Sequence, residues 1–392
     1  MTSNALESTD AVYLSLAIFA WNEEEVIGKT LESLFEQAIF SDLHARGLKA
    51  EIICVVNGCE DRTPEIAHAI FRQQTETHPG REGFVCRVVN LAERGKLNAW
   101  NQFVHSLSAA ESSFLAMMDA DILFQGRDTL GNMLATLEAN PEAHISVDRP
   151  LKEFGPRQRA GWRQNLSLGA SRMTQAAPAQ LCAQLYIIRA AVARNIYLPK
   201  DLAACEDGFI KAMVCTDFLT RPVNANRVQL AQGAAHSFEA YTSPGEVVKN
   251  QKRQIIGQTI VHILVDQYLA TLPLKRRLRL SETLQRKETT DPAWLKRLID
   301  GHLKRVKYFW KLYPDLLAGR FRRLASMGPG KRLACLPAAA AGFAVALVSS
   351  FLAYRFLKAG TTNYWPKAKR EKVQPGPTAP ALTLKTSISN PR

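Results

Sequence analysis

Four short apolar runs, separated by helical patterns, constrain the fold of this chain more than any other feature. They are residues 12–20, 52–56, 85–91 and 114–118. Each run has the length of a buried strand. The pattern after the first run is helical, because Val26, Ile27, Leu31 and Leu34 recur at helical spacing. Strands that alternate with helices predict an α/β fold, with a mostly parallel sheet and helices on both of its faces.

Two carboxylates stand one residue apart directly after the fourth apolar run. Asp119 and Asp121 would lie where a strand of a parallel sheet ends, which is where open α/β sheets bind their ligands. Side chains at positions i and i+2 of an extended segment point the same way. Both carboxylates can therefore face one hard cation, Mg²⁺ or Mn²⁺, which takes oxygen ligands together with substrate phosphates. A bare Asp-x-Asp pair is also common in surface turns, so the surrounding motifs decide.

Further polar motifs stand in a fixed order along the chain. They are residues 20–23 (Ala-Trp-Asn-Glu), residues 57–63 (Asn-Gly-Cys-Glu-Asp-Arg-Thr), Gly95 and Lys96 with Ala99 and Asn101, the pair Asp119 and Asp121, the strand-like residues 183–189, and Glu206 with Asp207. In this order and spacing the chain resembles the family-2 inverting glycosyltransferases of the GT-A fold, over roughly residues 12–260. Ala183 stands where that family usually has glycine.

The resemblance implies a metal-dependent reaction with a nucleotide-sugar donor, and a UDP-sugar is the expected donor. A departing diphosphate needs a cation and positive groups. By resemblance, Asp121 would bind the metal directly, and Asp119 would contact the ribose or the metal. The donor-binding residues that the motifs imply are Asn22, Glu23, Asn57, Asp61, Lys96, Asn101, Asp119 and Arg253. Many relatives carry Asp at position 57, so Asn57 leaves the nucleobase open.

An inverting transfer also needs a general base that takes the proton of the acceptor hydroxyl. The resemblance implies that Asp207 is this base and that the other catalytic residue, Glu206, orients or contacts the acceptor. Taken alone, the acidic pair fits the first turn of a helix better than a catalytic role, because carboxylates there interact favourably with the helix dipole. The order of the other motifs favours the catalytic interpretation.

Three of the donor-binding candidates have plain structural alternatives. Asp61 and Thr63 can cap the following helix through their side-chain oxygens. Lys96, taken alone, fits a solvated side chain at a helix start. Arg253 lies where processive polymer synthases carry Gln-x-x-Arg-Trp, but Asn250 and Gln254 replace the first and last residues of that motif. A guanidinium there suits a phosphate, and the basic face of an amphipathic helix is the equal alternative.

A long uncharged stretch follows the region of resemblance. Residues 333–354 contain no charged side chain, and 22 residues form a helix of about 33 Å, enough to cross a bilayer core of about 30 Å. The stretch is rich in alanine, and Pro337 can bend it. We expect a transmembrane or re-entrant helix, with a buried helix of a soluble protein as the alternative.

Positive charge is concentrated around that stretch. Residues 275–332 contain 17 Lys and Arg against 5 Asp and Glu, and the chain after Leu333 contains 8 against 1, while the whole chain has a net charge of +14. The part before residue 275 is therefore mildly acidic. Basic segments next to an apolar span are attracted to anionic lipid. Apolar residues at helical spacing predict an interfacial helix: Trp294, Leu295, Leu298, Ile299, Leu303, Val306, Trp310 and Tyr313. The adjacent span makes nucleic acid the weaker partner, and we expect none.

The N-terminus lacks a basic start followed by an apolar core, so we expect no signal peptide. We therefore expect a cytoplasmic catalytic domain that is attached to a membrane, and we expect this membrane to be the bacterial inner membrane. The seven cysteines show no metal-like pairing, and we expect them to stay reduced. The expected organisation is a flexible N-terminus (1–11), a GT-A domain (12–248), basic amphipathic interfacial helices (249–332), a transmembrane or re-entrant helix (333–354) and a basic, largely disordered tail (355–392).

We therefore expect a membrane-associated inverting glycosyltransferase that adds one sugar per encounter to a lipid or lipid-linked acceptor. A lone apolar span cannot form a conduit for a growing polymer, and the Arg-Trp motif is incomplete. The alternatives are a subunit of a polysaccharide synthase and a catalytically silent module of the same fold that recruits partners to a membrane. Asp119, Asp121 and Asp207 argue against the silent module, since such a module has no need for them.

Overall fold

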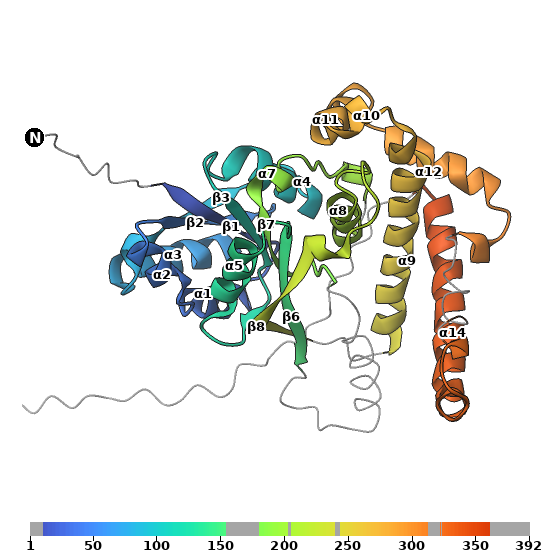
Figure 1. The fold of residues 1–392 in the computed structure, drawn as a ribbon, viewed down its shortest axis with the longest axis horizontal. Coiled ribbons are helices and arrows are strands. Elements are labelled where there is room, and N and C mark those ends of the chain that lie inside the picture. Colours follow the sequence, from blue (N-terminus) through green and yellow to red (C-terminus); the bar gives the residue numbers. More distant parts are fainter. Residues whose placement is uncertain are drawn as a thin grey trace, which may run out of the picture.

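The computed structural model describes residues 11–153, 180–202, 205–239, 244–312, 322 and 324–360. Its centre is an eight-stranded sheet with the strand order β3-β2-β1-β4-β7-β6-β8-β5 (Figure 1). The strands are β1 (Val12–Ala20), β2 (Lys49–Val56), β3 (Phe84–Asn90), β4 (Phe114–Asp119), β5 (Leu123–Phe124), β6 (Ile145–Glu153), β7 (Leu185–Arg189) and β8 (Val228–Glu239). All four predicted apolar runs are strands of this sheet.

The sheet is mixed, although most of its strands run in one direction. Strand β1 pairs in parallel with β2 and β4, β2 pairs in parallel with β3, and β6 pairs in parallel with β8. Strand β7 runs antiparallel to both of its neighbours, β4 and β6, and β5 runs antiparallel to β8. The predicted α/β class is confirmed, and the sheet is less uniformly parallel than the alternation of apolar runs indicates.

Helices cover both faces of the sheet. They are α1 (Ile27–Phe35), α2 (Ile39–Ala45), α3 (Thr63–Thr77), α4 (Lys96–Gln102), α5 (Thr129–Ala139), α7 (Ala190–Ala193), α8 (Glu206–Cys215), α9 (Pro244–Gln267), α10 (Leu274–Arg277), α11 (Leu280–Thr290), α12 (Trp294–Arg305) and α14 (Pro329–Lys358). Alternate residues of β1 point to opposite faces. Leu16 and Ile18 therefore pack in one core with α1, α2 and α5, and Ala17 and Phe19 pack in a second core with α4, α8 and α9.

Strand β4 ends at Asp119, and the chain turns immediately afterwards. Ala120 is buried, its carbonyl oxygen accepts a hydrogen bond of 2.9 Å from the hydroxyl of Thr30, and Asp121 is exposed within the turn. The expectation that Asp119 and Asp121 share one extended segment is therefore wrong. The two carboxylates still lie close enough for the charge of Asp121 to raise the pKa of Asp119.

The apolar stripe of α12 is buried against the protein, contrary to the prediction that it faces a lipid interface. Trp294, Leu295, Ile299 and Leu303 are at most 4% exposed and belong to the same core as α8 and α9. The helix ends at Arg305, so the predicted pattern does not continue as one helix to residue 313. An amphipathic stripe can be covered by protein or by lipid, and the spacing of its residues does not distinguish the two.

The last described helix, α14, lies beside α9 (Figure 1). It extends beyond both ends of the predicted span. Within it, Cys335–Lys358 is long and apolar enough to cross a membrane, with a mean hydropathy of 2.0 over a window of 18 residues. Among the described residues it is the one helix that meets this test. The predicted tail begins inside α14 and, from residue 361 onward, lies outside the described residues. So do residues 1–10 of the predicted flexible N-terminus.

Candidate active site

Three charged side chains from separate parts of the chain meet at the end of β4. The ammonium nitrogen of Lys96 lies 2.7 Å from Oδ1 of Asp119 and 3.2 Å from Oε1 of Glu206. Lys96 is the first residue of α4, Asp119 is the last residue of β4, and Glu206 is the first residue of α8. One lysine therefore connects the predicted metal and donor side of the site to the acidic pair that contains the predicted base.

The backbone before Lys96 is held in place by Asn57. Gly95 has φ of 138°, a conformation that glycine adopts without strain, and its N–H donates a 2.8 Å hydrogen bond to Oδ1 of Asn57. Asn57 follows β2 and is buried. The amide that was predicted to contact the nucleobase thus orients the loop that carries Lys96, and its contact with the donor stays a prediction.

Burial and charge shift the pKa values of this cluster in different ways. Burial raises the pKa of Asp119 to about 6, and the charge of Asp121 adds to the rise, while Lys96 acts in the opposite direction. Burial alone would lower the pKa of Lys96, but Asp119 and Glu206 outweigh it and hold this pKa above its ordinary value. Lys96 is therefore a permanent cation at neutral pH.

The carboxylates Asp119 and Asp121 fit a hard divalent cation. Neighbouring carboxylates are the kind of oxygen donors that Mg²⁺ and Mn²⁺ take, with substrate phosphates supplying the remaining ligands, and the charge of Asp121 acts on the pKa of Asp119. Within the described part of the chain, no group of three or more His, Cys, Asp or Glu residues is arranged to hold a metal ion by itself. The donor set thus fits an ion held jointly by the protein and a bound diphosphate, and the assignment to these two residues stays a prediction.

Asp207 has the surroundings of a carboxylate that takes up a proton readily. Burial raises its pKa, and the neighbouring charge of Glu206 raises it further. The N–H of Gly208, at 2.7 Å from Oδ1 of Asp207, and the charges of Lys96 and Arg253 lower it. Arg253 therefore acts on the predicted base. The structure does not test its predicted contact with donor phosphate.

Helix α9 brings Arg253 to the site by packing tightly against the start of α8. A Cβ atom added to Gly257 would lie 2.2 Å from the Cβ of Cys205, the residue before Glu206. Only glycine permits this approach, because real Cβ atoms do not come so close. The acidic pair at the start of α8 is therefore positioned by a helix that comes much later in the chain.

A buried aromatic pair lies beneath the charged cluster, and sequence reasoning did not single it out. The indole N–H of Trp100 donates a 2.7 Å hydrogen bond to the hydroxyl of Tyr186, and both side chains are buried. Burial raises the pKa of Tyr186, and the charges of Glu206, Lys96 and Asp119 act on it as well. Tyr186 lies within the strand motif 183–189, so position in that motif was the available signal.

The loops after β1 and β2 are tied together by the residues predicted to bind the donor. Oδ1 of Asn22 accepts from the N–H of Glu60 at 2.8 Å, and the N–H of Glu23 donates to the hydroxyl of Thr63 at 2.7 Å. Oδ1 of Asp61 accepts from the N–H of Thr63 at 3.1 Å, which is the capping role considered above. These bonds build a firm loop pair at the same edge of the sheet as Asp119.

Asn101 makes two hydrogen bonds to one backbone position. Its Nδ2 donates to the carbonyl oxygen of Leu198 at 2.8 Å, and its Oδ1 accepts from the N–H of Leu198 at 2.9 Å. Both ends of the amide are thus engaged in fixing the segment before α8. The predicted contact between Asn101 and the donor stays a prediction.

A buried histidine–aspartate pair lies behind the site. Nδ1 of His236 is 2.7 Å from Oδ2 of Asp148, and both side chains are fully buried. Nε2 of His236 lies 3.5 Å from Oε1 of Gln184, whose backbone oxygen accepts from the N–H of Asp119 at 2.8 Å. This chain of contacts links β6 and β8 to the last residue of β4.

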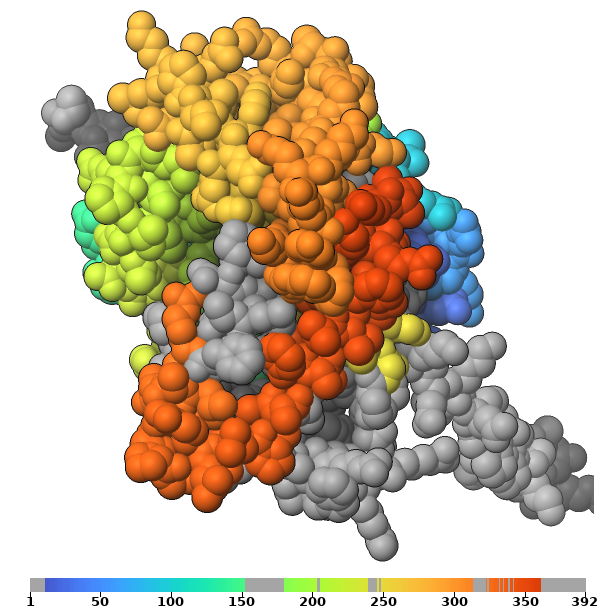
Figure 2. Space-filling model, turned by 90° about the vertical axis from the view of Figure 1, so that its right-hand side faces the viewer, coloured from blue at the N-terminus to red at the C-terminus, as the bar shows by residue number. Residues whose placement is uncertain are grey.

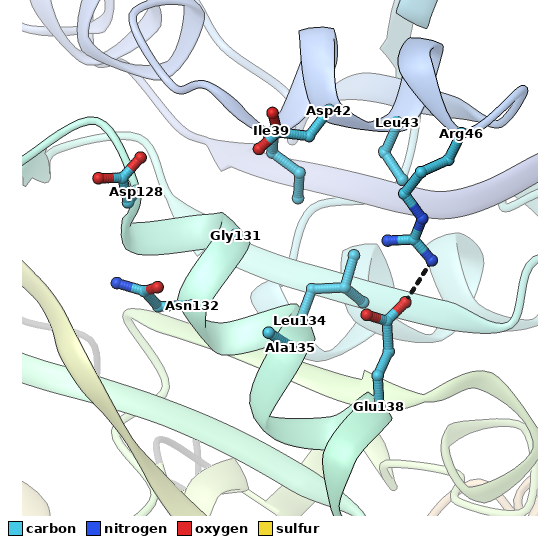
Figure 3. A pocket seen from close by; sticks show the side chains of 10 residues that line it. All are labelled: Ile39, Asp42, Leu43, Arg46, Asp128, Gly131, Asn132, Leu134, Ala135 and Glu138. Carbon is cyan, nitrogen blue, oxygen red and sulfur yellow. Dashed lines mark hydrogen bonds and ion pairs between the residues drawn. The ribbon is translucent and has the colours of Figure 1, made fainter.

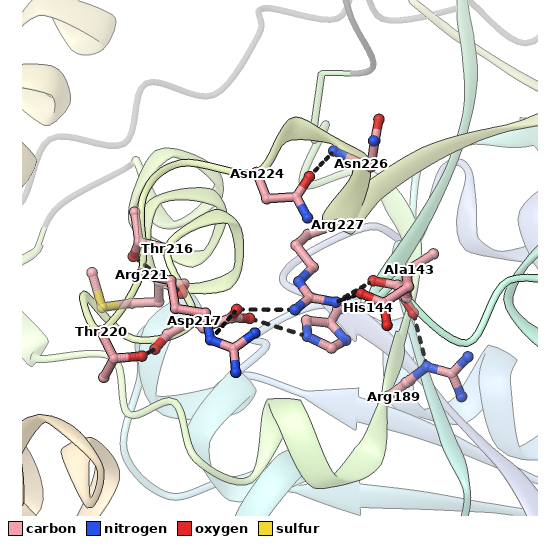
Figure 4. Close-up of polar contacts among 12 residues, drawn as sticks. Ala143, His144, Arg189, Thr216, Asp217, Thr220, Arg221, Asn224, Asn226 and Arg227 are labelled. Atoms are coloured by element: carbon pink, nitrogen blue, oxygen red, sulfur yellow. Dashed lines mark hydrogen bonds and ion pairs between the residues drawn. The ribbon is translucent and has the colours of Figure 1, made fainter.

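Two other polar features lie away from the charged cluster. Figure 3 shows a cavity of about 290 Å³ between α2 and α5, closed at one end by the ion pair of Arg46 and Glu138 at 2.7 Å. Figure 4 shows Arg227 and His144 meeting the carboxylate of Asp217, with Nη2 of Arg227 at 2.9 Å. Neither feature includes a predicted site residue. The second braces the end of α8 against the start of β8.

A comparison with protein-family models agrees with the predicted resemblance. Residues 15–187 match the sequence model described as "Glycosyl transferase family 2". This match includes Lys96, Asp119 and Asp121 and ends before Glu206 and Asp207. No curated protein matched the chain.

Three solved structures align with this chain at low identity and with TM-scores below 0.5. The mannosyltransferase PcManGT from Pyrobaculum calidifontis, in complex with GDP-Man and Mn²⁺, has a TM-score of 0.48 and 18% identity over 90% of this chain and 87% of that chain. TarS from S. aureus in complex with UDP-GlcNAc has a TM-score of 0.41 and 16% identity over 89% and 91%. Glucosyl-3-phosphoglycerate synthase from Mycobacterium tuberculosis, with Mn²⁺, UDP-glucose and phosphoglyceric acid, has a TM-score of 0.42 and 13% identity over 68% and 82%.

Proposed function

We propose that this chain, whose residues 15–187 match the sequence model of glycosyltransferase family 2, is an enzyme of that family and transfers a sugar from a nucleotide-sugar donor to a hydroxyl group of a lipid or lipid-linked acceptor. The observation that carries this proposal is the contact of Lys96 with both Asp119 and Glu206, at 2.7 Å and 3.2 Å. It connects the residues that suit a diphosphate and its metal to the acidic pair that suits an acceptor.

On the donor side, Lys96 and the two carboxylates at the end of β4 would hold the diphosphate. A divalent cation bound there would neutralise charge on the departing diphosphate. Asp119 and Asp121 would hold this cation, Mg²⁺ or Mn²⁺. Lys96 remains charged throughout, because its carboxylate partners keep its pKa high. The bonded loops that contain Asn22 and Asn57 would surround the nucleoside.

On the acceptor side, Asp207 would act as the general base. Burial and the charge of Glu206 raise its pKa, which makes it a better proton acceptor than an ordinary aspartate. As the acceptor oxygen bonds to the anomeric carbon, its proton passes to Asp207. The bond between that carbon and the diphosphate oxygen breaks, and its electron pair leaves with the diphosphate. A single displacement of this kind inverts the anomeric configuration.

The apolar helix α14 and the basic charge around it support a lipid or lipid-linked acceptor. An enzyme held at a membrane meets such an acceptor at high local concentration. The proposal places the catalytic domain on the cytoplasmic side of a membrane, and it places one sugar transfer in each encounter, since the motif of processive synthases is incomplete at Asn250 and Gln254.

The test is a donor and acceptor screen with the full-length protein. Purified protein, Mn²⁺ and a panel of UDP- and GDP-sugars are incubated with and without a bacterial lipid extract, and released nucleoside diphosphate is measured. We expect release with one donor class, stimulation by lipid, and a product whose anomeric configuration, determined by NMR, is inverted. Asp207→Asn should remove the release, whereas Asp42→Asn on the exposed surface of α2 should not. A product with retained configuration, or lipid-independent release that survives Asp207→Asn, would contradict the proposal.

A further inference from the structure

The exposed large apolar side chains of this protein are concentrated on one side. Among the described residues, twelve large hydrophobic side chains are exposed, and ten of them fall between Leu274 and Leu352. Six of these form what we term the apolar patch: Tyr308 and Trp310 beside Leu347, Val348, Phe351 and Leu352. An apolar surface of this kind, gathered rather than scattered, marks a site of interaction.

The two parts of the apolar patch lie against each other. Tyr308 and Trp310 stack with their ring centroids 4.7 Å apart, and Phe309 between them meets Phe351 of α14 at 5.5 Å. Phe309 and Lys311 bound a short 3-10 helix (Phe309–Lys311) that packs on α14. Figure 2 shows this side of the molecule, where α14 appears in dark orange to red and residues 294–312 in lighter orange. The patch is therefore one continuous surface from two chain segments.

The opposite face of α14 is buried against α9. Ala346, Ser350 and Ala353 are fully buried, and Leu357 is 1% exposed. The ammonium of Lys252 on α9 lies 4.2 Å from the ring centroid of Phe356. Positions 347, 348, 351 and 352 form the exposed stripe, which is the spacing of one helix face. Because this face of residues 346–357 is committed to protein, lipid cannot surround this part of α14 as it surrounds an isolated spanning helix.

The border of the apolar patch is positively charged. Both chain segments carry exposed cations, of which Lys311 and Arg355 lie against rings of the patch: Lys304, Arg305, Lys307, Lys311, Arg355 and Lys358. Neither residues 301–312 nor residues 322–360 contain an Asp or a Glu. The guanidinium of Arg355 lies 6.0 Å from the ring centroid of Phe351, so cation and apolar group belong to the same surface. Aromatic rings bordered by Lys and Arg suit the headgroup region of an anionic membrane.

We propose that the apolar patch docks on an anionic lipid surface with α14 lying along the membrane rather than across it. The aromatic pair and the exposed stripe of α14 enter the interface, and the surrounding cations contact the headgroups. The docking does not depend on the proposed acceptor. It nevertheless holds the active site at a fixed position relative to the membrane. Helix α9 contacts α14 and also contains Arg253, whose charge acts on Asp207.

The first test measures vesicle binding of the full-length protein. Sedimentation with vesicles of phosphatidylcholine and 30% phosphatidylglycerol is compared with phosphatidylcholine alone, at low and high salt. The variant Val348→Glu/Phe351→Glu adds two charges to the apolar patch. The matched control is Val85→Glu/Val223→Glu, which changes the two exposed valines outside residues 274–352.

We expect the patch variant to bind about tenfold or more weakly, since each glutamate removes apolar contact and meets anionic headgroups. The control should bind like the parent, and parent binding should weaken as salt rises. All three proteins should keep the same melting temperature, since the changed side chains are exposed. Equal binding by the patch variant and the control would overturn the proposal. If the patch variant changes only self-association in the absence of vesicles, a second copy of the chain occupies the patch and the proposal is wrong.

The second test distinguishes lying along the membrane from crossing it. Gly328→Cys and Ala359→Cys place thiols at exposed positions next to the two ends of α14, which are about 45 Å apart in a helix of 30 residues. Protein bound to the outside of sealed vesicles is treated with a membrane-impermeant maleimide, and the parent protein with its seven cysteines measures background labelling. We expect both added thiols to be labelled equally. Protection of one of them until the vesicles are lysed would show a spanning helix and overturn the proposal. Loss of vesicle binding with retained glycosyl transfer would separate failure of the docking from failure of the proposed function.

Discussion

Replacing Lys96 with methionine should destabilise the folded protein strongly, because two carboxylates depend on the charge of this lysine. At an effective dielectric constant of about 20, its attraction to Asp119 at 2.7 Å and to Glu206 at 3.2 Å amounts to about 6 and 5 kcal/mol before desolvation is subtracted. The desolvation of a buried amine offsets much of this attraction. Removing one member of a buried ionic group typically costs about 3–5 kcal/mol, because the remaining charges stay buried without compensation.

The pH dependence of this loss provides the sharper test. The pKa of Asp119 is already raised to about 6 in the folded parent, so its ionised form opposes folding, and stability falls as pH rises from the unfolded value near 4 through 6. Without Lys96, whose charge lowers the pKa of Asp119, this pKa must rise further. The variant should therefore be closest to the parent at pH 5, where Asp119 is mostly protonated, and furthest from it at pH 8.

Urea unfolding followed by tryptophan fluorescence measures the difference in the free energy of unfolding. The matched control is Lys29→Met, which removes an exposed lysine of α1 and should change stability by less than about 0.5 kcal/mol. In a double-mutant cycle, Lys96→Met combined with Glu206→Gln should cost less than the sum of the two single changes. A loss below about 1 kcal/mol that does not change between pH 5 and pH 8 would refute the central role of the ion pairs.

Three further outcomes follow from the arrangement of the site. Asp207→Asn should lower turnover by about 10² to 10⁴ while donor affinity persists, because a positioned general base contributes that much; donor affinity lost at unchanged turnover would assign Asp207 to the nucleotide instead. The acid limb of the kcat/KM profile should lie above pH 4, since burial and Glu206 raise the pKa of Asp207. Arg253→Gln should move this limb to still higher pH, since the guanidinium lowers that pKa; an unchanged limb in the variant would contradict the proposed effect of Arg253 on Asp207. Asp121→Ala should abolish turnover in a protein that melts like the parent, and chelator should reversibly do the same to the parent, whereas full activity in excess chelator would rule out the metal assignment.

The part of the fold that depends on local pattern was predictable. The apolar runs that became β1 to β4 are bounded by turn residues, and Pro64 lies in the first turn of α3, where its missing N–H costs nothing. Glu206 and Asp207 likewise stand in the first turn of α8. What local pattern does not contain is strand direction. The motif around Tyr186 predicts an apolar strand but does not indicate whether it runs parallel or antiparallel to its neighbours. Tertiary pairing makes β7 antiparallel to β4.

The candidate site shows the same division between local and long-range information. Asp119 and Glu206 were each identified from their own motifs, yet nothing local indicates that Lys96 bridges them. The pair formed by Trp100 and Tyr186 was missed for this reason as well, since its members are separated by 86 positions and meet only through the packing of α4 on the sheet. The prediction for the apolar stripe of α12 was wrong for a different reason. Its spacing was read correctly, but spacing does not say whether protein or lipid covers an apolar face.

Helix α9 contacts both α8, which carries the proposed base, and α14, which carries part of the apolar patch. Its hydrophobic side packs in the same core as α8, and Gly257 allows it to approach Cys205 closely enough to position Glu206 and Asp207. Its other side receives α14 through contacts such as that of Lys252 with Phe356. A single rigid helix of 24 residues thus connects the proposed membrane-docking patch to the proposed base. If α14 docks as proposed, a substitution at this helix contact should change activity toward a membrane-bound acceptor more than activity toward a soluble acceptor, because only the first depends on how the site is held at the lipid surface.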